Sequence, residues 1–105
     1  MSQERLPVSF QFEWDEDKAE ANLHKHGISF EEAITVFGDA LAVTIHNGQH
    51  STFEDRFVDI GRSIGGRVLV VVYTKREGAI RIISCRRATS AERRQYEQEE
   101  FGTTD

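Results

Sequence analysis

The apolar run VLVVVY at residues 68–73 is the feature of this sequence that most constrains its fold. The run does not alternate between apolar and polar residues, so both of its sides must be buried. It is also far shorter than the ~20 apolar residues that a membrane-spanning helix needs. We therefore predict that it forms a central β-strand covered on both faces.

The segments around this run have the patterns of further strands and of three helices. Gly27 closes a first helix that opens with acidic residues, and Ser29 with Glu32 and Thr89 with Glu92 have the spacing of capping boxes. Alternating apolar residues and intervening glycines indicate the strands and turns. The predicted strands span residues 10–14, 41–46, 56–64, 67–76 and 80–86, and the predicted helices span residues 15–27, 29–38 and 89–101.

This order of elements is typical of an α+β fold with a mostly antiparallel sheet, two N-terminal helices and one C-terminal helix. With 105 residues, 38% hydrophobic and 30% charged, we expect a single domain over residues 1–105, flexible at 1–9 and 98–105. The N-terminal residues lack an apolar signal segment, so we expect a cytoplasmic protein without membrane contact. The single cysteine, Cys85, lies between apolar neighbours and is expected to be a buried hydrophobe.

The charges are distributed very unevenly along the chain. Residues 1–55 contain 3 basic and 11 acidic residues, residues 56–96 contain 10 basic and 3 acidic, and residues 97–105 contain 4 acidic. A formal net charge of -5 therefore conceals a basic middle segment, which is typical of a protein that contacts a polyanion. Pairing between the two oppositely charged halves of the chain would explain the same pattern.

Five arginines gather in IRIISCRRATSAERRQY at residues 80–96. In a regular strand, Arg81 shares a face with Ile83 and Cys85, whereas Arg86 shares the other face with Ile80 and Ile82, so the two arginines should diverge. At least one of them would then lie among apolar groups and need an anionic partner, either an internal carboxylate or a bound phosphate.

The sequence lacks the motifs that are typical of several enzyme classes. It contains no Gly-rich phosphate loop, no CxxC pair, no HExxH and no GxSxG motif. His24 and His26 diverge on a helix, and His46 and His50 fall at a strand end and in a loop, so we expect neither a metal site nor a cofactor.

A metal-free site that cleaves RNA fits the remaining polar residues. His26 ends the first helix beside Lys25, where a cationic imidazole could contact phosphate or simply cap carbonyl groups. Glu54 and Arg56 begin a strand across the sheet from Arg81. A base could remove the 2′-hydroxyl proton while arginines stabilise the phosphorane, although a Glu54–Arg ion pair that joins strands would explain the same residues.

Three blocks of the sequence together resemble the BrnT family of bacterial type II toxins. They are FEWDEDKAEANLHKHGISFEEAITVF, EDRFVDIGRSIGGRVLVVVYTKREG and RIISCRRATSAERRQYE, which extend over nearly the whole chain from Phe12. Cys85 stands where the family pattern commonly has alanine, which is a small change. The resemblance implies a RelE-like fold and a metal-independent ribonuclease that inhibits translation.

The resemblance also implies a partner and a set of site residues. The partner would be a BrnA-type ribbon-helix-helix antitoxin that neutralises the toxin, forms a heterotetramer with it and carries the complex to operator DNA. The acidic first helix is either solvated surface or a dock for a basic antitoxin. The expected catalytic residues are Lys25, His26, Glu54, Arg56, Arg81 and Arg86, and the expected RNA-binding residues are Arg87, Arg93, Arg94 and Tyr96.

An alternative interpretation assigns no catalysis to the chain. In that hypothesis it is a module that binds a protein or a nucleic acid, and its arginines only form ion pairs. Simple electrostatic binding of RNA should weaken steeply with salt and leave the RNA intact, whereas a ribonuclease leaves shortened products.

Overall fold

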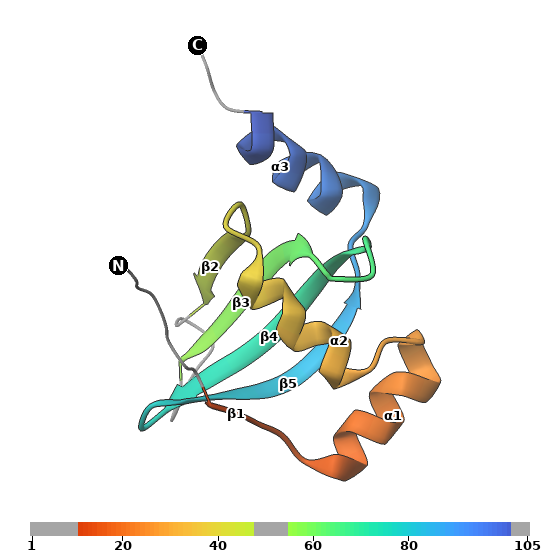
Figure 1. Cartoon of the computed structure of the whole chain (residues 1–105), viewed down its shortest axis with the longest axis vertical. Coiled ribbons are helices and arrows are strands. Elements are labelled where there is room, and N and C mark those ends of the chain that lie inside the picture. The colour runs from red at the N-terminus through yellow and green to blue at the C-terminus, as the bar shows by residue number, and fades with distance from the viewer. Residues whose placement is uncertain (1–10, 48–54, 102–105) are drawn as a thin grey trace, which may run out of the picture.

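The computed structural model describes residues 11–47 and 55–101 of the chain, and it forms one five-stranded sheet with three α-helices. Figure 1 shows α1 and α2 on one side of the sheet and α3 at the end far from the β4–β5 turn. The elements are β1 (Gln11–Glu13), α1 (Glu16–His26), α2 (Phe30–Ile34), a 3₁₀ helix (Thr35–Gly38), β2 (Val43–Asn47), β3 (Arg56–Arg62), β4 (Val68–Arg76), β5 (Ala79–Arg87) and α3 (Ser90–Phe101).

The apolar run forms the central strand, as predicted from its lack of alternation. The strand order is β1-β5-β4-β3-β2, which puts β4 in the middle of the sheet. Leu69 and Val71 are fully buried, and Val68 and Val70 on the opposite face are less than 10% exposed. All strand pairs are antiparallel except β1 with β5, so the predicted mostly antiparallel α+β fold is confirmed.

One face of the sheet packs against α1 and α2 and contains the main core. Phe30, Ala33 and Val36 from the helical segment pack with Leu69 and Val71 from β4. Burial of these side chains stabilises the fold by roughly 1.5–3 kcal/mol for each large one. No helix within the described residues is long and apolar enough to cross a bilayer.

Two of the three predicted helix-end motifs are present in full, and the third is present in part. Gly27 ends α1 in the left-handed region at φ 71°, and Thr89 and Glu92 exchange the two hydrogen bonds of a capping box. Ser29 caps α2 by accepting the Glu32 N–H, but the Glu32 carboxylate does not return the bond. It accepts hydrogen bonds from Arg67 instead, because that guanidinium provides a charged donor.

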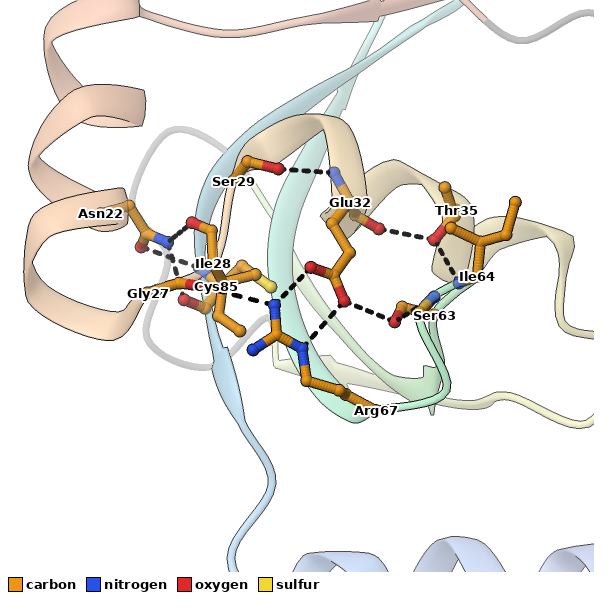
Figure 2. Close-up of polar contacts among 11 residues, drawn as sticks. Asn22, Gly27, Ile28, Ser29, Glu32, Thr35, Ser63, Ile64, Arg67 and Cys85 are labelled. Atoms are coloured by element: carbon orange, nitrogen blue, oxygen red, sulfur yellow. Dashed lines mark hydrogen bonds and ion pairs between the residues drawn. The ribbon is translucent and has the colours of Figure 1, made fainter.

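Asn22 of α1 replaces a neighbouring strand along part of β5. β1 pairs with β5 only up to Arg81, and within the described residues no strand pairs with the rest of that edge. The Asn22 side chain accepts the Cys85 N–H at 3.1 Å and donates to the Cys85 carbonyl at 2.8 Å, as Figure 2 shows. It also donates to the carbonyl of Ile28 at 3.0 Å. One buried amide thereby joins α1 to the sheet and to the start of α2.

A β-bulge in β5 overturns the prediction that Arg81 and Arg86 diverge. Val72 pairs with Ser84 and Tyr73 pairs with Ile82, so Ile83 is left without a partner on β4. The extra residue shifts the alternation by one position. Arg81 and Arg86 therefore share one face of the sheet, and Ile80, Ile82 and Cys85 lie in the core on the other face.

We call this arginine-bearing side the α3 face: it is the face opposite α1 and α2, and α3 covers one end of it. Tyr96 anchors that helix by packing on Ile60, Val68 and Val70. The Tyr96 hydroxyl donates to the Asp39 carboxylate at 2.7 Å. The packing of α3 on the sheet is therefore local.

Candidate functional site

A row of polar side chains crosses the α3 face at the end remote from α3. Glu13 is opposite Arg81 on the neighbouring strand, and Arg81 is opposite Thr74. Arg56 follows on β3, because Phe57 pairs with Tyr73 and the adjacent position faces Thr74. We call Glu13, Arg81, Thr74 and Arg56 the polar row.

The members of the polar row are held at different depths. The Arg81 Nη1 atom lies 3.3 Å from the Glu13 Oε2 atom, and the two side chains are 32% and 43% exposed. Arg56 is exposed. Thr74 is only 1% exposed, and its hydroxyl has no hydrogen-bond partner within the described part of the chain. The Thr74 hydroxyl is thus an unused hydrogen-bond donor on the strand between those that contribute Arg81 and Arg56.

The polar row has the groups that phosphodiester chemistry requires. Two guanidinium groups can bind the non-bridging oxygens of a phosphate and stabilise the charge that develops there. A carboxylate beside them can accept a proton. The loose, half-exposed pairing of Arg81 with Glu13 is a contact that a phosphate can replace at little cost.

Sequence analysis missed Glu13 and Thr74. Glu13 reaches the row only because β1 pairs in parallel with β5, and its three residues gave no signal for that partner. Thr74 follows the apolar run directly and could have been noticed as the one hydroxyl that continues a buried strand. Its unpaired state depends on neighbouring strands and is visible only in the structure.

Arg86 lies on the same face as Arg81 but nearer to α3. The two residues are five positions apart on β5, or ~16 Å at about 3.3 Å per residue. Both guanidinium ends of Arg86 donate to the Glu92 carboxylate, each at 2.8 Å. This pair lowers the pKa of Glu92 to about 2, with the hydrogen bonds from Arg86 as the largest cause. Arg86 is therefore engaged with α3 in this conformation.

Replacement of Glu92 by glutamine should lower the free energy of unfolding by about 1 kcal/mol at pH 7, since the pair is only partly buried. The pKa of Glu92 is lower in the folded than in the unfolded chain, so its contribution is complete above the ordinary pKa of 4.5 and is lost as the pH falls towards 2. Urea unfolding of both proteins between pH 6 and 2 should show the difference shrinking. A constant difference would contradict this account, and Glu97→Gln provides a control on the same helix.

A second basic surface lies at the end of the sheet where β4 begins and β5 ends. A pocket of about 240 Å³ opens there, which we call the end pocket. Arg67, which lines the pocket, also donates from its Nη2 atom to the carbonyl of Gly27, the residue that caps α1, at 3.4 Å. The residues that line the end pocket are Gly66, Arg67, Val68, Arg87, Ala88 and Arg93.

The structure thus divides the residues that sequence analysis grouped into one site. Arg56, Arg81 and Arg86 share the α3 face. Arg87 and Arg93 line the end pocket, and Lys25 and His26 precede the glycine that Arg67 contacts. Lys25 and His26 belong to α1, which packs on the other face, so they do not share the polar row.

Three other expectations concern Tyr96, Arg94 and Glu54. Tyr96 is 2% exposed and anchors α3, so its ring is covered in this conformation, and its role in RNA binding stays a prediction. Arg94 is exposed on α3. Glu54 lies outside the described residues, as does His50.

Two further predictions concern the burial of Cys85 and the binding of a metal ion. Cys85 is fully buried, and burial raises the pKa of its thiol to about 12, so it is a core side chain as predicted. Within residues 11–47 and 55–101, no three His, Cys, Asp or Glu side chains come together to hold a metal ion.

Comparisons with known proteins agree with this fold. The family model described as "Ribonuclease toxin, BrnT, of type II toxin-antitoxin system" matches residues 14–92. The crystal structure of the Brucella abortus ribonuclease toxin BrnT superposes with a TM-score of 0.60 at 26% sequence identity, and the match covers 78% of this chain and 100% of that one. A comparison with curated proteins gives no match.

The fold, its basic surfaces and the family match together define a ribonuclease toxin of a type II toxin-antitoxin system. More specifically, the chain belongs to the BrnT family, because the family model covers well over half of its length. The resemblance predicted from the sequence motifs is therefore confirmed. Membership of a type II system also implies an antitoxin as partner.

Proposed function

We propose that this chain is a metal-independent endoribonuclease that cleaves RNA at the polar row and thereby inhibits translation. The observation that carries the proposal is the alignment of Arg81 and Arg56 on either side of Thr74, with the Glu13 carboxylate at the end of the row. In this mechanism the 2′-hydroxyl oxygen attacks the adjacent phosphorus while the two arginines hold the phosphorane oxygens. The bond from phosphorus to the 5′-oxygen then breaks, the 5′-oxygen takes a proton from water, and a 2′,3′-cyclic phosphate remains on the other fragment.

A carboxylate is the base that this arrangement favours. Glu13 is already beside Arg81, and Glu54 lies two positions before Arg56 in the sequence. Either can act as the base, because a carboxylate oxygen accepts a proton from a hydroxyl group held beside it. Arg86 can contribute a third guanidinium to the same face once a ligand competes with Glu92. Lys25 and His26 are assigned to RNA contacts beside the end pocket.

The proposed partner is a BrnA-type ribbon-helix-helix antitoxin that neutralises the toxin in a heterotetramer. Family membership supports an antitoxin, and the sequence resemblance supports its type. The exposed carboxylates of Glu16, Asp17 and Glu20 on α1 offer a surface that complements a basic partner. We propose that operator DNA is contacted only through the antitoxin and that the complex acts in the cytoplasm.

Incubation of the purified chain with RNA in EDTA tests the proposal. We expect shortened RNA products at a rate that the chelator does not change, because the polar row supplies its positive charge from arginines. The same reaction is run with free RNA and with translating ribosomes, because a ribonuclease of this kind can act on free RNA or require RNA that is bound to the ribosome. Intact RNA in both reactions at high protein concentration would contradict the proposal and favour the non-catalytic binding module.

A further inference from the structure

The end pocket concentrates positive charge that the polar row does not use. Arg67 enters it from the turn before β4, Arg87 from the end of β5, and Arg93 from the second turn of α3. The pocket lining contains no carboxylate. Three arginines from three different elements line the pocket, and the nearest compensating carboxylate is Glu32, which pairs with Arg67 behind the pocket wall.

Arg67 is fixed in place by the carboxylate behind it. Its Nε atom donates to the Glu32 Oε2 atom at 3.1 Å, and its Nη2 atom bonds the other carboxylate oxygen, as Figure 2 shows. Ser63 also donates to Glu32 at 2.6 Å. The hydrogen bonds from Arg67 are the largest cause that lowers the pKa of Glu32, so the carboxylate stays ionised. The network pre-organises one wall of the end pocket.

Arg87 and Arg93 remain available to a ligand. Within the described residues, the Arg87 guanidinium makes no hydrogen bond or close ion pair, its side chain is exposed, and its positive charge helps to lower the pKa of Glu32. Arg93 has only a loose i,i+4 pair with Glu97 at 3.6 Å, in which the side chains are 60% and 44% exposed. Pairs of this kind contribute little and exchange readily for a phosphate.

The end pocket is too far from the polar row for one phosphate to contact both. Arg81 and Arg87 are six positions apart on β5, or ~20 Å at about 3.3 Å per residue, and the register puts them on opposite faces. At about 3.4 Å per stacked nucleotide, the distance along β5 alone takes about six nucleotides, and the passage from one face of the sheet to the other requires additional nucleotides. A strand cleaved at the polar row can therefore reach the end pocket with a distant phosphate.

We propose that the end pocket is a separate phosphodiester-binding subsite that holds the RNA strand several nucleotides away from the point of cleavage. Arg87 is its principal ligand, and Arg67 and Arg93 flank it. The inference rests on the proposed function, because the strand it describes is the substrate of the polar row. It implies that the protein binds a long RNA more tightly than a short one.

Binding of a non-cleavable RNA tests the subsite without requiring catalysis. A 2′-O-methyl 12-mer is titrated into the ¹⁵N-labelled protein and into Arg87→Ala, and the dissociation constant is measured at several salt concentrations. Loss of one charged hydrogen-bonding group should weaken binding ~10-fold. It should also make the slope of log affinity against log salt shallower by about 0.7, the value for one phosphate on a single strand. Lys18→Ala, which removes an exposed charge from α1, is the matched control.

The amide signals locate the bound strand. We expect the 12-mer to shift the amides of residues 66–68 and 87–88 together with those of the polar row, and Arg87→Ala to abolish only the first set. Unchanged affinity and salt slope in Arg87→Ala would overturn the inference. Inorganic phosphate that shifts the pocket amides at concentrations where the 12-mer does not would overturn it too, because the pocket would then select free phosphate. If the unmodified protein does not cleave RNA but the 12-mer still shifts the pocket amides, the result would count against the proposed function alone.

Discussion

Replacement of Arg81 by alanine should lower the rate of RNA cleavage by at least ~100-fold. The expectation follows from its position in the polar row, where its guanidinium can bind the phosphorane more tightly than the ground-state phosphate. Removal of one such donor typically costs 10²–10³ in rate. Single-turnover cleavage of a defined oligonucleotide in EDTA measures the effect directly.

The stability of the Arg81→Ala protein should be nearly unchanged. The residue is about one-third exposed, and its pair with Glu13 is a partly solvated one that contributes at most about 1 kcal/mol. Arg81→Lys should recover part of the rate, because it retains the charge without the planar fork. Lys18→Ala again controls for the loss of a positive charge. A folded Arg81→Ala protein with the original rate would exclude the polar row as the catalytic surface.

Replacement of Asn22 by alanine should lower the free energy of unfolding by about 3 kcal/mol. The substitution deletes three hydrogen bonds, at 2.8, 3.0 and 3.1 Å, and leaves the Cys85 N–H buried without a partner. Each unsatisfied buried group costs about 1–3 kcal/mol, and relaxation around the shorter side chain recovers part of the sum.

Urea unfolding at pH 7 measures this loss. His24→Ala, at an exposed position of the same helix, should change the free energy of unfolding by less than about 0.5 kcal/mol. Asn22→Asp should also destabilise, because it retains the acceptor for the Cys85 N–H but turns a second oxygen towards two carbonyl groups. A loss below about 1 kcal/mol for Asn22→Ala would show that water replaces the amide at the edge of β5.

Local rules predicted most of the fold. The unbroken apolar run identified the central strand because a strand buried on both faces cannot alternate. Gly27 and the Thr89–Glu92 pair located helix ends because the unpaired backbone groups there depend on residues close in sequence. The expectation of one domain over residues 1–105 stays a prediction.

Features that depend on distant contacts were not predictable in the same way. The bulge at Ile83 arises from the pairing of β4 with β5, and it reverses the faces assigned to Arg86 and Cys85. Glu13 enters the polar row through a three-residue parallel pairing. Glu32 leaves its capping box because Arg67, remote in sequence, offers a stronger donor. The candidate site is built from such contacts. The sequence therefore identified its arginines but did not predict which of them lie together.

The most direct test of the account compares the cleavage of two matched oligonucleotides by the purified chain in EDTA. One is ordinary RNA, and the other carries a 2′-O-methyl group at each position. If the polar row activates the 2′-hydroxyl, only the ordinary RNA should be cleaved, and its 5′ fragments should end in a 2′,3′-cyclic phosphate. Cleavage of the 2′-O-methyl strand, or cleavage that requires an added metal ion, would contradict the central claim.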